Sequence, residues 1–214
     1  MNARPAPGSF ISIEGIEGVG KSTNINFICE ILDDIGIKHI STREPGGTPI
    51  AEKIRHLLLA IDNKSICPMS ELLMIFAGRA QHMHELIEPA LLEGTWVVCD
   101  RFTDATYAYQ GAGRGLPAEL IEQMEVIVQG SIRPDLTLIF DIQAHLGLER
   151  ASQRSNPDRF EREEIEFFNR ARECYLARAR AFPNRCKLID ASQSISQVQS
   201  ELNDLLRDFV VSRQ

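Results

Sequence analysis

The sequence lacks the features that mark membrane, secreted and nucleic-acid-binding proteins. No apolar run comes near the about 20 residues that a membrane-spanning helix needs, and the N-terminus has no apolar core of the kind found in signal peptides. Positive charge is scarce as well. The 214 residues carry a formal net charge of −7, whereas a nucleic-acid binder needs a clustered basic face. These absences predict a cytoplasmic protein with no membrane and no nucleic-acid partner.

Cysteine is present, but without the spacing of a metal site or a disulfide framework. The five cysteines are an odd number, and no two of them form a CxxC pair. Scattered thiols of this kind are typical of a reducing compartment. The acidic balance still permits a small anionic substrate, because a few local arginines can make a positive pocket in an acidic protein.

Short β-branched segments alternate with longer amphipathic segments along the chain. Strands are expected near 9–14, 37–42, 96–99, 136–140 and 187–189. Helices are expected near 21–35, from 49, over 69–92, from 117, after 141 and over 195–209. This alternation predicts an α/β protein whose parallel five-stranded sheet is covered by helices on both faces.

No repeat, low-complexity stretch or Ser/Gly linker divides the chain. The simplest expectation is one domain over 9–213, preceded by a disordered tail over 1–8. In a sheet of this type ligands bind at the carboxyl ends of the strands. Functional motifs should therefore follow the strands directly.

One motif follows the first expected strand and opens the first expected helix. Gly15-Ile16-Glu17-Gly18-Val19-Gly20-Lys21-Ser22 matches the phosphate-binding pattern G-x-x-x-x-G-K-[ST] in full. The glycines let successive N–H groups face inward, and the helix N-terminus adds a favourable partial charge. The residues expected to bind ATP are Gly15, Ile16, Glu17, Gly18, Val19, Gly20, Lys21, Ser22 and Thr23. Lys21 should reach the β- and γ-phosphates, and Ser22 should offer its hydroxyl to Mg²⁺.

Glu17 is unusual inside such a loop. Its carboxylate would repel phosphate if it pointed inward, so it should face outward, toward a donor such as a sugar hydroxyl. A solvated side chain at an unconstrained position is the alternative.

A second motif follows the strand expected over 96–99. Asp100 ends an apolar run, which is the pattern of an acidic group placed near Mg²⁺. Arg101 beside it has the forked guanidinium that clamps a phosphate. Read alone, the two could also be an ordinary surface pair at a strand end.

Four arginines surround a Ser-Asn-Pro-Asp break between 150 and 162. They are Arg150, Arg154, Arg159 and Arg162. Such a segment suits a mobile lid that brings positive charge over the transferring phosphoryl group and excludes water. The neighbouring glutamates also fit a plain solvated stretch. The lid is favoured because the P-loop has no basic residue besides Lys21, so transition-state charge must be met from elsewhere.

Three further blocks resemble bacterial thymidylate kinases, a family of P-loop nucleoside monophosphate kinases. The blocks are Thr42-Arg43-Glu44-Pro45-Gly46-Gly47-Thr48, Leu72-Leu73-Met74-Ile75-Phe76-Ala77-Gly78-Arg79-Ala80-Gln81-His82, and Asp100-Arg101 with Ala108-Tyr109-Gln110-Gly111. They occur in the family's order and at similar separations over nearly the whole chain. The resemblance implies a P-loop kinase fold with a mobile lid, transfer of the γ-phosphoryl of ATP to dTMP, and a homodimer in which 69–92 is a candidate surface.

The resemblance also implies roles for single residues. Glu17 would hold the deoxyribose 3′-hydroxyl, and Arg101 would hold the dTMP phosphate beside Glu44 and Pro45. Phe76 would stack on thymine while Arg79 hydrogen-bonds the base. The nucleoside pocket would also be lined by Thr106, Tyr109 and Gln110. Arg150 and Arg154, with Arg159 as a further choice, would serve the ATP phosphates.

The chain departs from the family at one position of this pocket. Many members have the stacking Phe four residues before the arginine, where this chain has Ile75, while Phe76 lies three before. Both spacings fall on the same side of a helix. Phe76 is therefore the expected base-stacking residue, with Ile75 as the competing one.

A phosphate acceptor simplifies the chemistry. Its second pKa lies near 6, so it is mostly dianionic at neutral pH and needs no strong base. Catalysis then consists of aligning two anions and offsetting their repulsion. The expected catalytic residues are Lys21, Asp100, Arg101, Arg150 and Arg154, and the expected Mg²⁺ ligands are Ser22 and Asp100.

Other P-loop proteins fit parts of the same pattern. A kinase for another small acceptor, such as a different nucleoside monophosphate, a deoxynucleoside or shikimate, would share the P-loop and Asp100. A regulatory switch would bind nucleotide without acceptor-stimulated turnover. A GTPase is disfavoured because no N-K-x-D segment is present. A DNA motor is disfavoured because the chain is short and acidic.

Overall fold

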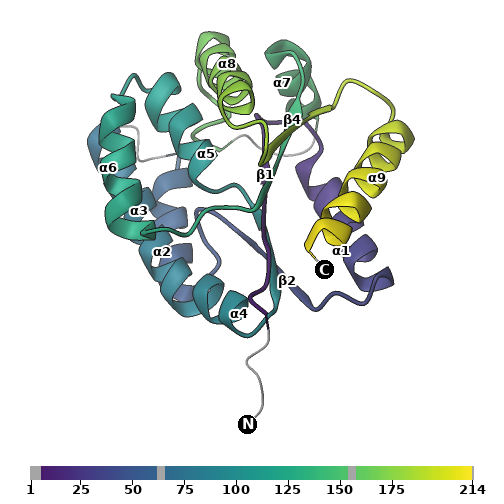
Figure 1. The fold of residues 1–214 in the computed structure, drawn as a ribbon. Coiled ribbons are helices and arrows are strands. Elements are labelled where there is room, and N and C mark those ends of the chain that lie inside the picture. The colour runs from purple at the N-terminus through teal and green to yellow at the C-terminus, as the bar shows by residue number, and fades with distance from the viewer. Residues whose placement is uncertain (1–5, 62–65, 154–157, 214) are drawn as a thin grey trace.

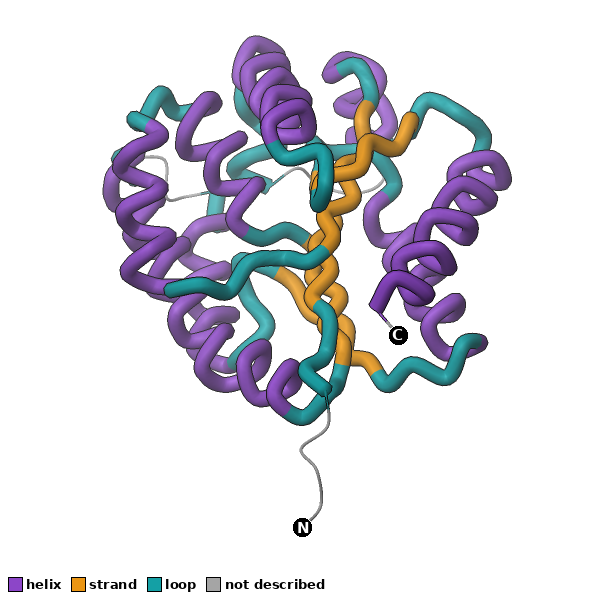
Figure 2. Tube along the Cα trace, in the orientation of Figure 1, coloured by secondary structure: helices purple, strands orange, loops and turns teal. Residues whose placement is uncertain are grey.

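A five-stranded parallel sheet forms the centre of the molecule. The computed structural model describes residues 6–61, 66–153 and 158–213. The strands follow one another in the order β2-β3-β1-β4-β5, and all four pairings are parallel. Their bounds are Phe10–Glu14 for β1, His39–Arg43 for β2, Trp96–Asp100 for β3, Leu136–Asp141 for β4 and Cys186–Asp190 for β5. Figure 2 shows the strands running between two groups of helices.

Helices connect successive strands and cover both faces of the sheet. Their bounds are α1 Lys21–Asp34, α2 Pro49–Leu59, α3 Pro68–His82, η1 Met83–Ile87, α4 Glu88–Leu92, α5 Thr103–Thr106, η2 Tyr107–Gly113, α6 Ala118–Gln129, α7 Ala144–Ser152, α8 Ile165–Ala181 and α9 Ile195–Arg213. α1 and α9 lie together on one side of the sheet, and α2, α3, α4 and α6 lie on the other (Figure 1). No helix within the described ranges combines the length and apolar character that crossing a bilayer requires.

Local features of the sequence account for the observed elements. All five residues of β1 are buried, as expected for a central parallel strand. The Thr48 side chain caps α2 by accepting from the Ala51 N–H at 3.4 Å, and proline opens the helix. Ser194 and Gln197 bond reciprocally at the start of α9 and form a capping box. The predicted α/β class and the parallel five-stranded sheet are confirmed.

Three features differ from the prediction. The helix expected over 69–92 has a π-helical turn, η1, just before Pro89, whose ring leaves the preceding turn without a regular hydrogen bond. A helical segment over 103–113, α5 and η2, was not predicted. In the expected tail, residues 1–5 lie outside the described ranges, but the Gly8 N–H donates to the Leu91 carbonyl at 2.8 Å and so belongs to the fold.

The sheet register gathers the functional motifs at one edge. Asp100 at the end of β3 stands opposite Ile13 of β1 and Arg43 of β2. The P-loop, the segment from Glu44 and the turn at Arg101 therefore leave the sheet side by side. This is the edge at which parallel sheets bind ligands.

Candidate active site

A pocket with a cavity volume of about 260 Å³ opens at this edge. The P-loop lines one end of it and the helices η2 and α3 line the other, with the end of β3 between them. The lining includes most of the residues predicted from sequence: Glu17, Gly18, Val19, Gly20, Lys21, Ser22, Glu44, Pro45, Arg79, Asp100, Arg101, Thr106, Tyr109 and Gln110. Residues distant in sequence thus meet in a single concave site.

The P-loop wall of the pocket is built from main chain. Gly15, Gly18 and Gly20 have φ of 130°, 72° and 86°, a region that side chains disfavour. At Gly18 an added Cβ would stand 1.8 Å from the Gly147 carbonyl oxygen, so the loop also needs glycine there to pack against α7. α1 begins without a side-chain cap. Its first N–H groups therefore face the loop and suit an anionic ligand.

The other three predicted loop residues lie behind this wall. The Gly15 and Ile16 carbonyls face Lys21, the Ile16 side chain is buried, and Thr23 is exposed outside the pocket.

Lys21 folds back onto its own loop. Its ammonium donates to the carbonyl oxygens of Gly15 at 3.1 Å and Ile16 at 2.9 Å. Desolvation, followed by the positive charge of Arg101, lowers the pKa of Lys21 to about 8. The side chain is thus held among neutral acceptors, and an anionic phosphate would be a far better partner.

Asp100 and Ser22 meet the requirements of a magnesium site. Both line the pocket, and Asp100 Oδ1 is buried without a hydrogen-bond partner in the part of the chain described. A buried carboxylate oxygen left unpaired is costly, and Mg²⁺ prefers such hard oxygen ligands. The residues present therefore fit this ion.

Arg101 occupies a strained position in the turn after β3. Its φ of 68° is in the left-handed region, which a residue with a side chain seldom adopts. The guanidinium donates to Glu17 Oε1 at 2.8 Å and to the Gly15 carbonyl at 2.9 Å, and it lies 4.7 Å from the ring centre of Tyr109. This turn aims the positive charge at the junction of the P-loop and the rest of the pocket.

Glu17 points out of the phosphate loop, as its charge predicts. Its carboxylate accepts from Arg101 and, at 2.9 and 2.7 Å, from the Tyr109 hydroxyl. Burial, together with the negative charge of Glu17 and the hydrogen bond to it, outweighs the opposing charge of Arg101 and raises the pKa of that hydroxyl well above its usual range, so Tyr109 stays a donor. The carboxylate lies where it can accept a hydrogen bond from a ligand hydroxyl as well.

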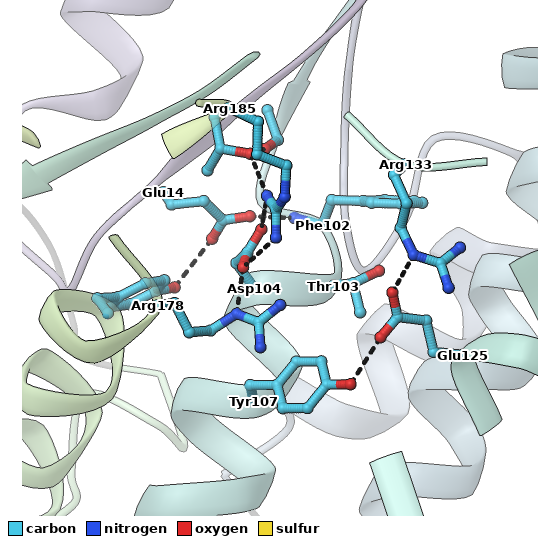
Figure 3. A network of polar contacts seen from close by, with 12 residues as sticks. Glu14, Phe102, Thr103, Asp104, Tyr107, Glu125, Arg133, Arg178 and Arg185 are labelled. Atoms are coloured by element: carbon cyan, nitrogen blue, oxygen red, sulfur yellow. Dashed lines mark hydrogen bonds and ion pairs between the residues drawn. The ribbon is translucent and has the colours of Figure 1, made fainter. Parts of the chain in front are cut away.

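A buried polar network supports the turn from below (Figure 3). Glu14 Oε1 accepts from the Phe102 N–H at 2.7 Å, and Glu14 Oε2 accepts from the Tyr175 hydroxyl at 2.9 Å. Burial, followed by the charge of Asp104, raises the pKa of Glu14 to about 8. Asp104 is held in turn by Arg178 and Arg185. No local sequence pattern indicates this network, because its members come from distant segments.

The far end of the pocket contains a buried ion-pair cluster. Arg79 Nε donates to Glu44 Oε2 at 2.7 Å and Arg79 Nη2 to Thr106 Oγ1 at 3.0 Å. Glu44 Oε1 also meets His82 Nδ1 at 3.0 Å, and His82 Nε2 lies 2.7 Å from the Thr42 hydroxyl. The side chains of Arg79, Glu44 and His82 are at most 4% exposed. Glu44 and Arg79 are thus fixed before any ligand arrives.

Arg79 keeps one donor for a ligand. Its guanidinium carbon lies 4.9 Å from the ring centres of both Phe76 and Phe102. Its Nη1 is buried and has no hydrogen-bond partner among the described residues. An unpaired buried donor in a pocket wall marks a place for an acceptor atom.

The structure does not bring Phe76 into the pocket. Its ring is 1% exposed and packs with Leu72 and Ile121 beneath Arg79. Ile75, the competing residue, lines the pocket instead. One position along a helix rotates a side chain by about 100°, which separates the pocket wall from the core. Phe76, expected from the sequence to face the nucleoside pocket, thus lies in the core of this structure, and Ile75 takes the position in the pocket wall.

The three expected lid arginines that the structure describes do not converge on the P-loop. Arg150 Nη1 donates to the Ala191 carbonyl at 2.9 Å, Arg159 turns toward α3, and Arg162 is exposed. Arg154 lies outside the described residues. The described end of the segment brings Asp158, Phe160 and Glu161 to the pocket, residues that sequence analysis had not singled out.

Arg55 is a further lining residue that sequence analysis missed. It lies in α2, donates to the Pro45 carbonyl at 2.8 Å and faces the pocket beside Asp100. Burial, followed by the charge of Arg43, lowers the pKa of Arg55. Only the amphipathic pattern of α2 could have indicated its position.

Comparison with known proteins identifies the family to which this site belongs. A sequence model described as "Thymidylate kinase" matches residues 13–202. The thymidylate kinase of Teredinibacter turnerae is 54% identical over 203 residues, covering 95% of this chain and 99% of that protein. The thymidylate kinase of Pseudomonas syringae pv. tomato is 53% identical, with 95% and 97% covered.

A solved structure agrees with these sequence matches. The crystal structure of thymidylate kinase from Ehrlichia chaffeensis superposes with a TM-score of 0.77 at 35% identity, covering 94% of this chain and 99% of that one. Neither the kinases for other acceptors nor the switch protein considered from sequence finds support in these matches. The chain belongs to the thymidylate kinase family, whose enzymes use ATP to phosphorylate dTMP.

Proposed function

We propose that the P-loop end of the pocket takes the phosphates of ATP and that the Arg79 end takes dTMP. The observation that carries this assignment is that both ends belong to one cavity, with Arg101 and Glu17 paired at their junction. A donor phosphate on the P-loop and an acceptor phosphate near Arg101 would then approach each other inside the same pocket. This arrangement suits in-line transfer, which depends on alignment.

Alignment and charge neutralisation account for the chemistry. The acceptor phosphate is mostly dianionic at neutral pH, so no residue has to remove a proton. Lys21 exchanges its carbonyl partners for β- and γ-phosphate oxygens, and Arg101 holds the acceptor phosphate. Mg²⁺ held by Ser22 and Asp100 supplies further positive charge when it is bound. Asp100 therefore acts in metal binding rather than as a base.

The acceptor nucleoside is recognised by groups that are already in place. The free Nη1 of Arg79 donates to a carbonyl oxygen of the base, and Ile75 packs against the base. Glu17 accepts from the 3′-hydroxyl, as its outward orientation allows. The remaining wall of the nucleoside pocket is formed by Glu44, Pro45, Thr106, Tyr109 and Gln110.

The segment 150–162 serves as the lid of this enzyme in our proposal. Asp158, Phe160 and Glu161 already line the pocket. Arg150 would have to leave the Ala191 carbonyl to reach an ATP phosphate, a change that nucleotide binding would favour. Arg154 is the other expected donor. The single domain over 9–213 includes this lid.

The chain acts as a cytoplasmic homodimer in the same proposal. Large apolar side chains are exposed on α2, α3 and α6, on the side of the sheet that carries these helices: Leu57, Met69, Leu73, Val126 and Ile127. A patch of this kind on a protein of this size suits contact with another chain. Light scattering on the purified protein measures its mass directly, and a monomer at micromolar concentration contradicts the dimer.

An acceptor panel tests the proposed specificity. Release of ADP is measured with dTMP, dUMP, UMP, CMP, AMP and thymidine at equal concentrations. We expect dTMP to give the highest kcat/KM and thymidine, which has no phosphate for Arg101, to give almost none. A rate with dTMP no greater than with the other acceptors rules the proposal out.

A further inference from the structure

Glu71 is a fully buried carboxylate that does not line the pocket. Its two oxygens accept from three side chains: Gln110 Nε2 at 2.8 Å, Arg114 Nε at 3.1 Å and Arg159 Nη2 at 2.6 Å. Burying a carboxylate is unfavourable unless charged partners and hydrogen bonds surround it. These donors come from two parts of the chain, η2 with its following turn and the segment after residue 157, so Glu71 holds the two parts together.

Arg159 fixes the second of these parts. Besides Glu71, its guanidinium donates to the Leu58 carbonyl at 2.6 Å and lies 4.5 Å from the ring centre of Phe160. Its backbone N–H donates to the Leu59 carbonyl. The start of the segment is thereby tied to the end of α2 as well as to α3.

Arg114 makes a second tie a few residues further on. Its Nη1 pairs with Glu163 Oε1 at 2.7 Å, and its guanidinium carbon lies 5.6 Å from the ring centre of Phe160. Glu71 and Glu163 thus share one arginine. The segment 158–163 is clamped at both ends to the half of the molecule that holds the nucleoside wall.

The clamped segment carries three pocket residues. Asp158 Oδ1 accepts from the N–H groups of Phe160 at 2.8 Å and Glu161 at 3.0 Å, which forms a tight turn. This turn presents Asp158, Phe160 and Glu161 to the pocket. Gln110 on the opposite wall is held by the same Glu71 oxygen as Arg114. One carboxylate therefore sets the spacing between the nucleoside wall and the turn.

We propose that Glu71 is a positioning residue for phosphoryl transfer. It fixes the 158–163 turn relative to Gln110, so that a nucleotide bound against Gln110 meets a preformed roof. The inference rests on the proposed function, in which this end of the pocket takes dTMP. Loss of the clamp should weaken use of dTMP and leave nucleotide binding on the P-loop unchanged, because the side-chain hydrogen bonds of Glu71 and Arg159 within the described residues go to no P-loop residue.

The pair Glu125 and Arg133 provides a matched control. Glu125 is 6% exposed, accepts from the Tyr107 hydroxyl at 2.7 Å and pairs with Arg133. It resembles Glu71 in burial and in having an arginine partner. None of these three residues lines the pocket. Glu125→Gln should therefore lower stability without changing the KM for dTMP.

The experiment is a double-mutant cycle on Glu71→Gln and Arg159→Met. For each variant, the double variant and Glu125→Gln, the measurements are kcat, the KM for dTMP, the Kd for ADP, and amide hydrogen exchange over 158–163. We expect each single clamp variant to raise the KM for dTMP about 10- to 100-fold. The KM of the double variant should be no higher than that of the more impaired single variant. The Phe160 and Glu161 amides should exchange faster, and the ADP Kd should stay within about twofold.

The results separate this inference from its rivals. An unchanged KM for dTMP in either folded single variant, additive effects, or an equal change in Glu125→Gln overturns the positioning role. A loss confined to ADP binding in Arg159→Met shows that Arg159 acts on the donor nucleotide and also overturns it. If Glu71→Gln does not fold, the comparison of Arg159→Met with Glu125→Gln in the same measurements tests the positioning role. If the wild-type enzyme shows no dTMP-dependent release of ADP, the result contradicts the proposed function itself rather than the positioning role of Glu71.

Discussion

The two ends of the pocket are built on opposite principles. At the P-loop end the wall is main chain, and its charged groups lack charged partners or are incompletely paired: Lys21 rests on two carbonyls and Asp100 has an unpaired oxygen. At the Arg79 end the wall consists of side chains locked in buried ion pairs, such as Arg79 with Glu44. The charged groups at the P-loop end remain incompletely paired until a charged ligand binds, whereas those at the Arg79 end are already paired with each other.

This difference matches the ligand that each end takes in the proposed function. A triphosphate offers charge and little shape, so a loop of N–H groups with one lysine suffices, and binding itself supplies the missing charge. A nucleoside offers a specific edge and face. Reading it requires donors and acceptors held in fixed places, and buried ion pairs hold them. Arg101 lies at the junction of the two ends.

Replacing the residue at the junction should have the largest effect. Arg101→Ala removes the only guanidinium that contacts both Glu17 and the Gly15 carbonyl among the described residues. We expect kcat to fall on the order of a thousand-fold, with the ADP Kd nearly unchanged, because the loop N–H groups and Lys21 remain. Stopped assays with saturating dTMP measure the first quantity and calorimetry the second.

The control for this change keeps the charge. Arg101→Lys retains a cation but loses the forked guanidinium that binds phosphate through two hydrogen bonds. Its kcat should therefore lie between those of the wild-type enzyme and Arg101→Ala. Unchanged turnover in purified Arg101→Ala would remove Arg101 from the mechanism and leave the two ends of the pocket without a common residue.

Breaking the acceptor-side cluster should come next in size. Glu44→Ala leaves Arg79 and His82 buried without their carboxylate. We expect a loss of about 3–5 kcal/mol in the free energy of unfolding, because an uncompensated buried charge remains. Urea titration measures it. Glu52→Ala, which removes the carboxylate of the half-exposed Arg43 pair, should cost only about 1 kcal/mol. Equal losses in the two variants would mean that the acceptor side is not prebuilt.

The sequence predicts the P-loop end better than the other end for the same reason. Gly15 to Ser22 are contiguous, so their spacing alone defines the loop. The acceptor end joins residues 39, 43 and 88 positions apart around Glu71, a convergence that no local pattern contains. At Ile75 and Phe76 the sequence placed both on one helix face, and only packing decided which faces the pocket. Strands β1, β3 and β4 are predicted because each is a short, buried and mostly apolar run, whereas β2 and β5 are only partly buried.

Raising the pH should weaken nucleotide binding at the P-loop end. The pKa of Lys21 lies near 8, so the free enzyme loses this positive charge as the pH rises through 8, whereas bound phosphate stabilises the ammonium. The ADP Kd should therefore increase, approaching about tenfold per pH unit above 8, with uptake of a proton on binding. Calorimetry in buffers of different ionisation enthalpy measures both.

A guanidinium at the same place removes the titration. Lys21→Arg keeps its charge throughout this range, so its weaker ADP binding should be independent of pH between 7 and 9.5. An ADP Kd that does not change with pH in the wild-type enzyme would show that Lys21 stays charged while it donates to the two carbonyls. Lys21 would then give no support to the contrast between an incompletely paired P-loop end and a paired Arg79 end.

The smallest expected effect concerns the aliphatic wall of the acceptor end. Ile75→Phe offers an aromatic face to the base, and such a pair adds about 0.5–1.5 kcal/mol beyond area burial, so the Kd for dTMP should fall about two- to tenfold while the ADP Kd stays constant. Phe76→Leu is the control, since Phe76 packs in the core and should lower the unfolding midpoint without a comparable gain in dTMP affinity. Phe76→Leu could instead weaken dTMP binding as strongly as Ile75→Phe improves it. That result would mean that the contact of Phe76 with the Arg79 guanidinium matters more for dTMP binding than the side chain at position 75, because a less ordered Arg79 would displace its free donor.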